Sequence, residues 1–428
     1  SDVISVNDVS VAFLQSDSYP EDQAPRFVSY EKYRESVETI FQLLGPIYGQ
    51  RAASREWYFT LSRWLTSDEM GFKQGTNEPC LFVNPVTGVK LVIYCDDFLV
   101  RGSGVESAKF HASLESRFDC RPGSRQVLTP DNPIEFTGVR ISMEKGVKTD
   151  KYFMDQSEAI ARFLEAHDMC DVKCRESPMP KAETLYSDSE LLSEDESSWC
   201  RSVIGCLHFL VRASRWDVAH SVSRVSQFNC KPTRGTVKSL RVIAGYLKGS
   251  IDFKLGGSRL LDMDDHFSVF TDSDHHGDKL MTSKSQTGVM ILLNGIPIHW
   301  RSNKQPTTAD SPACAEIYAL KECVRDARLL HWVAEEMGIP ISWPFVVNCD
   351  SKQAISFQQD TCPKSKIRGS FDLREDWVAE IRDQKVVSMA KVPGEKNLAD
   401  LMTKCMPTWK FQRMYKMIQN FQSRIFGE

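Results

Sequence analysis

Long apolar runs, paired cysteines and a strong net charge are all missing from this sequence of 428 residues. No apolar stretch approaches the roughly 20 residues that a helix needs to cross a bilayer, so we expect neither a membrane-spanning segment nor a membrane partner. The chain starts at Ser1 rather than at a methionine, and no basic-then-apolar start follows it. We therefore expect a piece of a longer protein without a secretion signal.

The 13 cysteines include no Cys-x-x-Cys pair. Cys170 and Cys174 are the closest two, and no further histidine or cysteine lies at zinc-finger spacing around them. This distribution favours reduced cysteines in an intracellular protein over disulfides or a zinc site.

The formal net charge of −4 hides an uneven distribution of charge. From Arg201 to Lys254 there are ten lysines or arginines and two acids, Asp217 and Asp252, which gives the segment a net charge of 10 − 2 = +8. Backbone phosphates are bound by such local patches rather than by total charge. The segment is therefore a candidate contact surface for nucleic acid, and a solvated basic face is the ordinary alternative.

Two changes of composition divide the chain. Residues 186–198 are acidic and rich in serine, and residues 256–265 begin with glycines and end in acids. Before the first break, the pattern predicts a helix over 50–65 and a strand, tight turn and strand over 91–100. The middle part has helical periodicity. The last part begins with strands and continues with a helix near 313–337 and another strand, so the sequence predicts a mixed α/β protein.

Asp96 and Asp97 lie at the predicted hairpin tip, and aspartate is a favoured turn residue. The functional alternative is a divalent-metal site, because nucleotidyl transfer uses two hard cations held by carboxylate oxygens. A third carboxylate should then come from a neighbouring strand. Asp8 is available for that role on an apolar, strand-like stretch.

Short motifs around these aspartates resemble reverse transcriptases. The segment YCDD, which ends at Asp97, resembles their Y-x-D-D box, and DVSVAFL, which begins at Asp8, resembles the D-V-x-x-A-F-L motif of copia-type LTR retrotransposon Pol polyproteins. The resemblance implies that Asp8, Asp96 and Asp97 bind the catalytic metals. It also implies that Phe13 lies under the sugar of a deoxynucleotide and excludes a 2′-hydroxyl. Plain core packing is the ordinary role for that ring, and both can hold.

The resemblance is incomplete near the nucleotide pocket. The segment YGQRAASREWY, which begins at Tyr48, resembles the family's Y-G-L-K-Q-A-P-R-A-W-Y. The family's glutamine falls on Ala52 and its proline falls on Ser54, and alanine cannot make the glutamine's polar contact. The fingers that precede the first aspartate in the family are absent from this chain. The polymerase site is therefore present only in part.

Four further carboxylates occur in the last part of the chain: Asp272, Glu316, Asp350 and Asp400. Two-metal hydrolysis of RNA needs about four carboxylates from separate elements. Asp272 is in a strand interior, where a charge is costly, and this position favours a functional role. Taken singly, the residues also have ordinary explanations. Glu316 could be a solvated helix residue, Asp350 could cap the following helix, and Asp400 could favour a helix N-terminus.

Taken together, the four carboxylates resemble the ribonuclease H pattern of copia-type elements. That pattern is Y-S-D-A-D, K-Q followed by A-E, C-D-N-Q-S-A-I and L-A-D-x-x-T-K. The corresponding segments here are FTDSD, KQ followed by AE, CDSKQAI and LADLMTK, in the same order. The resemblance implies that all four residues bind Mg²⁺, with Mn²⁺ as the alternative ion, and cleave the RNA of an RNA–DNA hybrid.

We accordingly expect three parts: a reverse transcriptase palm with truncated fingers over 1–145, a helical thumb and connection over 146–262, and a ribonuclease H-like domain over 263–428, with a mixed sheet flanked by helices. The resemblance implies reverse transcriptase and ribonuclease H activities with an RNA template, a DNA primer, a hybrid duplex and dNTP as partners. Assembly with itself or with other polyprotein segments is also implied. The expected location is cytoplasmic, in a virus-like particle, with the nucleus as the alternative. The rival hypothesis is a degenerate relic that retains only ribonuclease H activity or nucleic-acid binding.

Overall fold

The structure is a computed structural model, and its two compact units are Ser1–Thr137 (unit 1) and Gly138–Glu428 (unit 2). It describes residues 2–19, 26–31, 38–146, 149–179, 190–258, 266–275, 277, 283–359, 380–381 and 384–426. The predicted breaks at 186–198 and 256–265 lie partly outside these residues. The finer division at residues 145 and 262 remains a prediction.

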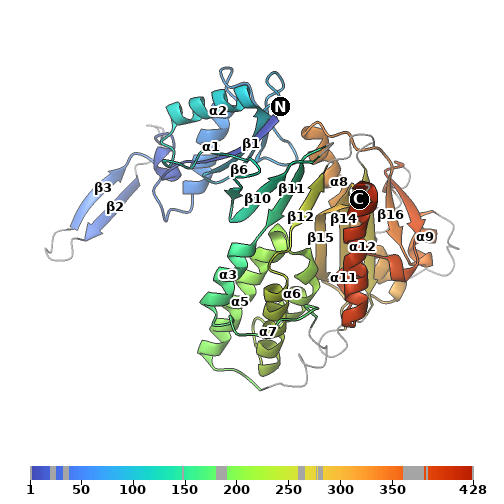
Figure 1. The fold of residues 1–428 in the computed structure, drawn as a ribbon. Coiled ribbons are helices and arrows are strands. Elements are labelled where there is room, and N and C mark those ends of the chain that lie inside the picture. The colour runs from blue at the N-terminus through green and yellow to red at the C-terminus, as the bar shows by residue number, and fades with distance from the viewer. Residues whose placement is uncertain are drawn as a thin grey trace. The chain divides into compact units, whose positions relative to one another are not determined.

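Unit 1 contains a six-stranded sheet in the order β4-β5-β6-β7-β1-β8 and a separate two-stranded hairpin, β2–β3 (Figure 1). The predicted strand, turn and strand over 91–100 are β6 and β7, which pair from Tyr94 opposite Asp97. The described elements are β1 (Asp2–Asp8), η1 (Ala12–Gln15), β2 (Arg26–Glu31), β3 (Glu38–Leu43), α1 (Ala53–Leu65), β4 (Lys73–Gln74), β5 (Leu81–Val83), β6 (Lys90–Tyr94), β7 (Asp97–Ser103), α2 (Gly104–Arg117), β8 (Gln126–Val127) and β9 (Ile134–Phe136).

The core of unit 1 lies between its sheet and helices α1 and α2. Trp57 and Leu61 of α1 are buried, as their helical spacing predicts, and they share one cluster with Phe98 and Phe110. The Trp57 indole also donates a hydrogen bond of 2.8 Å to the carbonyl oxygen of Cys95, in the turn between β6 and β7. The core therefore fixes the hairpin tip on which the acidic pair lies.

The helices α3, α5, α6 and α7 of unit 2 form what we call the helical group (Figure 1). Its helices share one apolar cluster with α12, in which the rings of Trp216 and Tyr415 stack at 5.4 Å. Serine and threonine caps define two of the helix starts: Ser193 and Glu196 form a capping box on α5, and Thr233 caps α7. The helical middle part that the periodicity predicts is confirmed.

Unit 2 also contains a five-stranded mixed sheet, in the order β15-β14-β13-β16-β17, and β10, β11 and β12 pair in a separate antiparallel sheet. Strands β13, β14 and β15 are antiparallel, whereas β13, β16 and β17 are parallel. The described elements of unit 2 are β10 (Val139–Glu144), β11 (Lys151–Asp155), α3 (Ser157–Ala166), α5 (Glu194–Ala213), η2 (Trp216–Val218), α6 (Ala219–Ser226), α7 (Arg234–Gly249), β12 (Leu255–Ser258), β13 (Phe267–Asp274), β14 (Gln286–Leu293), β15 (Ile296–Lys304), α8 (Pro312–Glu336), β16 (Phe345–Cys349), α9 (Lys352–Gln358), β17 (Val387–Lys391), η3 (Gly394–Lys396), α11 (Asp400–Thr403) and α12 (Thr408–Phe426).

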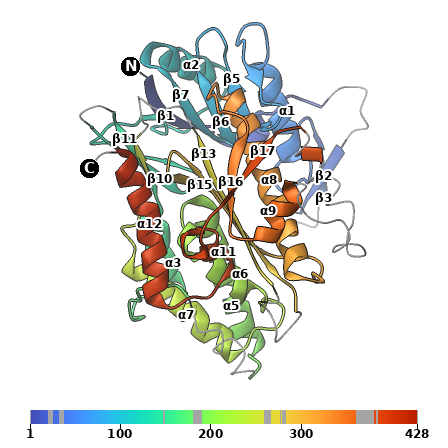
Figure 2. The same ribbon diagram turned by 90° about the vertical axis from the view of Figure 1, so that its right-hand side faces the viewer.

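Helix α8 packs on one face of this sheet, and α11 packs on β14 (Figure 2). Ser311 caps α8, and Pro312 occupies its first turn, where the missing amide costs no hydrogen bond. Leu320 and Val324 of α8 contribute to a core with Val269 and Ile291 of the sheet. The chain is therefore a mixed α/β protein, as predicted.

All cysteines among the described residues are free. Of the helices that the structure describes, none combines the length and the apolar character that a bilayer-crossing segment needs.

Candidate metal centre

The register of two parallel strands places Asp272 beside Asp350. Strand β13 pairs with β16 so that Val269 lies opposite Val347. Asp272 and Asp350 each come three residues later, so the same register brings them to equivalent positions on neighbouring strands. Because β13 and β16 lie in the middle of the sheet, the first carboxylate is buried, with a residue exposure of 1%.

Asp400 reaches the same place from the short helix α11. The Asn397 amide, which is fully buried, donates a hydrogen bond of 2.9 Å to the carbonyl oxygen of Thr271 and fixes the start of α11 against β13. Gly288 of β14 provides the room: a β-carbon there would lie 2.5 Å from Thr403 Cγ2 and 2.8 Å from the Ala399 carbonyl oxygen. A side chain at this glycine would push α11 away from the sheet.

The carboxylates of Asp272, Asp350 and Asp400 each offer an oxygen atom within 4.8 Å of the others. Among the described residues, no other group of three or more potential ligands is so closely gathered. We call these three residues the acid cluster. Glu316 on α8 lies near it, because the charges of Asp272 and Asp350 act on its carboxyl, but it is not within the 4.8 Å group.

The carboxyl group of Glu316 has few partners that could stabilise a negative charge in this position. One carboxylate oxygen, Oε2, is buried and has no hydrogen-bond partner among the described residues. Burial, followed by the negative charges of Asp272 and Asp350, raises the pKa of Glu316 to about 9. Burial also raises the pKa of Asp272 to about 6, although Lys404 counteracts this shift.

Two lysines neutralise part of the acid cluster, and the sequence analysis assigned neither of them a role. Lys404 Nζ lies 2.6 Å from Asp400 Oδ1 and 3.2 Å from Asp272 Oδ2, and Lys410 Nζ lies 3.1 Å from Asp400 Oδ2. Thr403 also donates its hydroxyl hydrogen to Asp272. Lys404 lies four residues after Asp400 in the LADLMTK motif, and this spacing is the feature of the sequence that could have predicted its contact with Asp400.

The ordinary explanations for Glu316 and Asp350 do not fit their surroundings. Glu316 is not a solvated helix residue, because one of its oxygens is buried. Asp350 does not cap α9, because the capping side chain is that of Ser351. Asp400 does lie in the first turn of α11, as its ordinary explanation predicts, but its carboxylate also binds two lysines.

The chemistry of these donors suits a divalent cation. Hard cations such as Mg²⁺ and Mn²⁺ prefer carboxylate oxygens, and the three aspartates present oxygens from three separate elements. The orphaned Oε2 of Glu316 gives a second indication, because a buried carboxylate oxygen without a partner is costly unless a cation approaches it. Asp272, Asp350 and Asp400 are therefore the residues that could hold a metal ion, with Glu316 adjacent.

The predicted aspartates of unit 1 also lie together. Asp8 ends β1 and pairs directly with Asp97, the first residue of β7. The Val9 amide donates a 3.0 Å hydrogen bond to the carbonyl oxygen of Asp96, which holds the hairpin tip against the end of β1. Burial, then the charges of Asp8 and Asp96, raises the pKa of Asp97 to about 6.

Other predicted features of the polymerase pocket are only partly formed. Phe13 is half-buried at the edge of the core, and its ring lies 4.8 Å from that of Tyr48, so packing is one role of this ring. Ala52 is the N-cap residue of α1 and makes no side-chain cap, and Ser54 lies in the first turn of that helix. The gating role of Phe13 stays a prediction.

The net charge of +8 predicted for residues 201–254 overstates the free positive charge of this segment. Arg215 is buried and paired at 2.8 Å with Asp217, an acid that the count already includes. Acids just outside the segment, which the count omitted, neutralise other members. Ion pairs are formed between Arg201 and Glu194, between Arg234 and both Glu190 and Glu196, and between Lys254 and Glu144.

No protein-family model matches the chain. It is similar, however, to curated proteins over almost its whole length. It is 26% identical over 424 residues to the "Retrovirus-related Pol polyprotein from transposon TNT 1-94" of Nicotiana tabacum, which covers 96% of this chain and 30% of the relative. It is 26% identical to the corresponding RE1 polyprotein of Arabidopsis thaliana, over 98% of this chain and 27% of the relative.

A yeast relative shows the same extent of similarity. The chain is 23% identical to the "Transposon Ty1-LR2 Gag-Pol polyprotein" of Saccharomyces cerevisiae, over 95% of this chain and 23% of the relative. The chain thus spans less than a third of the length of these proteins. Among solved structures, the ribonuclease H1 LC11 in complex with an RNA/DNA hybrid aligns with 21% identity and a TM-score of 0.25, covering 32% of this chain and 93% of the other. The resemblance to the Pol polyproteins of copia-type retrotransposons, inferred from short motifs, is confirmed across almost the whole chain.

Proposed function

We propose that unit 2 hydrolyses the RNA strand of an RNA–DNA hybrid in a reaction that requires Mg²⁺ or Mn²⁺. The observation that carries the proposal is the acid cluster, whose three carboxylates present oxygens within 4.8 Å of one another from β13, from the end of β16 and from α11. The similarity to Pol polyproteins supports it, because the segments that carry the three aspartates and Glu316 resemble that family's ribonuclease H motifs.

Each residue of the proposed nuclease site would have its own role. Asp272 and Asp350, adjacent on the sheet, and Asp400 on α11 would hold divalent cations, which supply an activated water and stabilise charge on the scissile phosphate. Glu316 would complete the ligand set through its buried carboxylate. Lys404, which bridges Asp272 and Asp400, would give up these contacts or share them with the ions. Contacts with 2′-hydroxyl groups and duplex shape would distinguish the hybrid from DNA.

Hydrolysis of an end-labelled RNA–DNA hybrid in Mg²⁺ tests this proposal on the full chain. We expect wild-type protein to cut the RNA strand and Asp350→Asn to be inactive. Asp252→Asn, at an exposed position of the same unit, is the matched control and should cut at the wild-type rate. A folded wild type that does not cut the hybrid contradicts the proposal.

We propose as a second activity that unit 1 contributes to RNA-directed DNA synthesis. The observation in its favour is the meeting of Asp8, Asp96 and Asp97 at the ends of β1, β6 and β7. Primer extension on an RNA template with dNTP and Mg²⁺ tests it, with Asp96→Asn as the inactive variant. Absence of extension by a preparation that cuts the hybrid would favour the rival, a relic that retains only ribonuclease H activity.

A further inference from the structure

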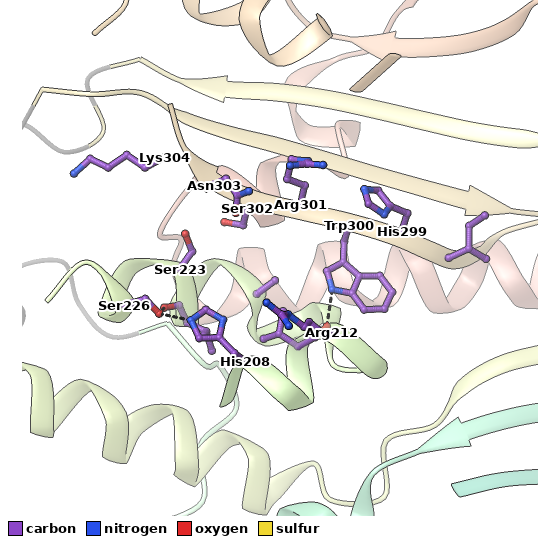
Figure 3. Close-up of a pocket in the computed structure, with 14 residues that line it drawn as sticks. His208, Arg212, Ser223, Ser226, His299, Trp300, Arg301, Ser302, Asn303 and Lys304 are labelled. Atoms are coloured by element: carbon purple, nitrogen blue, oxygen red, sulfur yellow. Dashed lines mark hydrogen bonds between the residues drawn. The ribbon is translucent and has the colours of Figure 1, made fainter. Parts of the chain in front are cut away.

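A groove runs through unit 2 between the helical group and strand β15, and it encloses about 680 Å³. One wall comes from the C-terminal half of α5 and from α6, and the other comes from β15 between residues 298 and 304. Figure 3 shows His208 and Arg212 on the helical wall and Ser302, Asn303 and Lys304 on the strand wall. This groove has no part in the acid cluster described above.

The lining of the groove is rich in cationic and polar groups. None of its 14 residues is an aspartate or glutamate, and five are arginine, lysine or histidine. Arg212 is exposed and forms no ion pair with any acid among the described residues. Its positive charge acts on its neighbour: burial and then Arg212 lower the pKa of His208. The groove therefore attracts negative charge.

Not every basic residue of the lining contributes to that attraction. Arg301 and His299 both bind Asp326 on α8, at 2.7 Å and 3.0 Å, and are compensated within the protein. Lys304 donates to the Gln227 amide oxygen at 3.0 Å, a neutral partner. Of the two arginines in the lining, Arg212 is therefore the one whose charge no described acid compensates.

Hydroxyl groups complement Arg212 on the helical wall. Ser223 accepts a 2.9 Å hydrogen bond from Gln286. Ser226 bonds His208 at 2.9 Å. A guanidinium beside hydroxyl donors is the combination that proteins use for phosphodiester oxygens, because the planar fork of arginine binds two of them at once.

The strand wall of the groove is joined to the element that carries Asp400. The Ser302 hydroxyl donates a 2.6 Å hydrogen bond to the carbonyl oxygen of Met402, in α11. The Gln286 amide bridges the two walls by donating to both Ser223 and Ser302. The strand wall of the groove is thus hydrogen-bonded to the short helix that carries Asp400.

From this geometry we infer that the groove between α5–α6 and β15 binds backbone phosphates of the nucleic acid, with Arg212 as the principal anchor and Ser223 as a supporting donor. The inference rests on the proposed nuclease function, to which it adds a phosphate-binding surface outside the catalytic site. Phosphate contacts of this kind position a duplex without reading its sequence.

Binding of a fluorescent RNA–DNA hybrid to the full chain in EDTA, at several salt concentrations, tests the inference without cleavage. Each phosphate contact contributes close to one unit to the slope of log K against log salt. We expect Arg212→Gln to weaken binding by about 3- to 10-fold and to reduce the slope by about 1. Arg212→Lys should restore most of the slope, because it keeps the charge.

The matched control is Arg162→Gln on α3, an exposed arginine of the same unit outside both the groove and the basic segment 201–254, which should retain wild-type affinity and slope. The inference is overturned if Arg212→Gln keeps the wild-type slope, or if Arg162→Gln loses as much as Arg212→Gln. The nuclease proposal fails separately: a wild type that binds the hybrid through Arg212 but never cuts it supports the groove and refutes the nuclease.

Discussion

Unit 1 and unit 2 each gather aspartates at strand ends, but they stabilise them differently. In unit 2 the side chains of Asp272 and Asp400 are 1% and 3% exposed, and lysines bind both of them. In unit 1 the Asp8 side chain is 21% exposed, and its ion pair is with Arg121, itself 71% exposed, at 3.1 Å. Water can therefore solvate Asp8 of unit 1, whereas it hardly reaches Asp272 and Asp400 of unit 2. The deeper cluster therefore depends on built-in cations, and the shallower cluster does not.

Aspartate-to-asparagine changes should give the largest effects and separate the two sites. Asp272→Asn removes a ligand from the acid cluster, so we expect hybrid cleavage to fall by more than about 100-fold. Asp96→Asn should instead remove primer extension and leave cleavage intact. Both activities are measured on the same preparations. Loss of both activities in either variant would show that the two sites are not independent.

Filling the space at Gly288 should disrupt unit 2 alone. A valine there would collide with Thr403 and with the backbone of α11, so we expect a loss of about 3 kcal/mol in the free energy of unfolding. Divalent-ion binding should weaken as well, because α11 carries Asp400. Urea denaturation provides the measurement. Gly205→Ala in α5, where a β-carbon meets nothing within 4 Å, is the control and should be neutral or slightly stabilising.

Glu316→Gln should change the pH dependence of stability. Its folded-state pKa of about 9 lies above the ordinary value of 4.5, so folding retains a proton that the unfolded chain releases. Wild-type stability is therefore lost progressively as the pH rises from 4.5 towards 9. In EDTA at pH 8 we expect the variant to be more stable by up to about 5 kcal/mol, and at pH 4 to match the wild type. If the free energy of unfolding of the variant differs from that of the wild type by the same amount at pH 8 and at pH 4, this explanation is refuted.

Lys404→Met should have the smallest effect, with opposite signs in two measurements. Removing a cation from a buried pair costs several kcal/mol, but Lys404 is 35% exposed, so solvent screening reduces the expected loss to about 1 kcal/mol in metal-free buffer. Because Lys404 competes with metal ions for the carboxylates of the acid cluster, the variant should bind Mn²⁺ more tightly. Thermal unfolding and calorimetric titration measure the two quantities. Weaker Mn²⁺ binding would mean that Lys404 supports the ions rather than opposing them.

Much of the fold was predictable because its signals are local. The hairpin at YCDD, the Trp57 face of α1 and the strand that carries Asp272 all follow from periodicity and turn chemistry within about ten residues. The order of the four carboxylates in unit 2 was also predictable, because each lies inside a short motif. Their convergence is consistent with the parallel register of β13 and β16.

What the sequence did not reveal depends on long-range contacts. Nothing in the sequence near Arg234 or Lys254 shows that Glu196 and Glu144, 38 and 110 residues away, compensate their charges. The need for glycine at position 288 comes from α11, more than 100 residues later in the chain. The groove has the same origin, because its walls meet only when β15 packs beside α5 and α6.

The most direct test of the account is the location of a metal ion in a crystal of the full chain grown with Mn²⁺. The anomalous signal of manganese identifies the ion independently of any activity. We predict a peak bound by Asp272, Asp350 and Asp400, with Lys404 displaced or sharing the carboxylates. An acid cluster with no peak, in which Lys404 still bridges Asp272 and Asp400, would contradict the claim that unit 2 is built around a divalent-metal site.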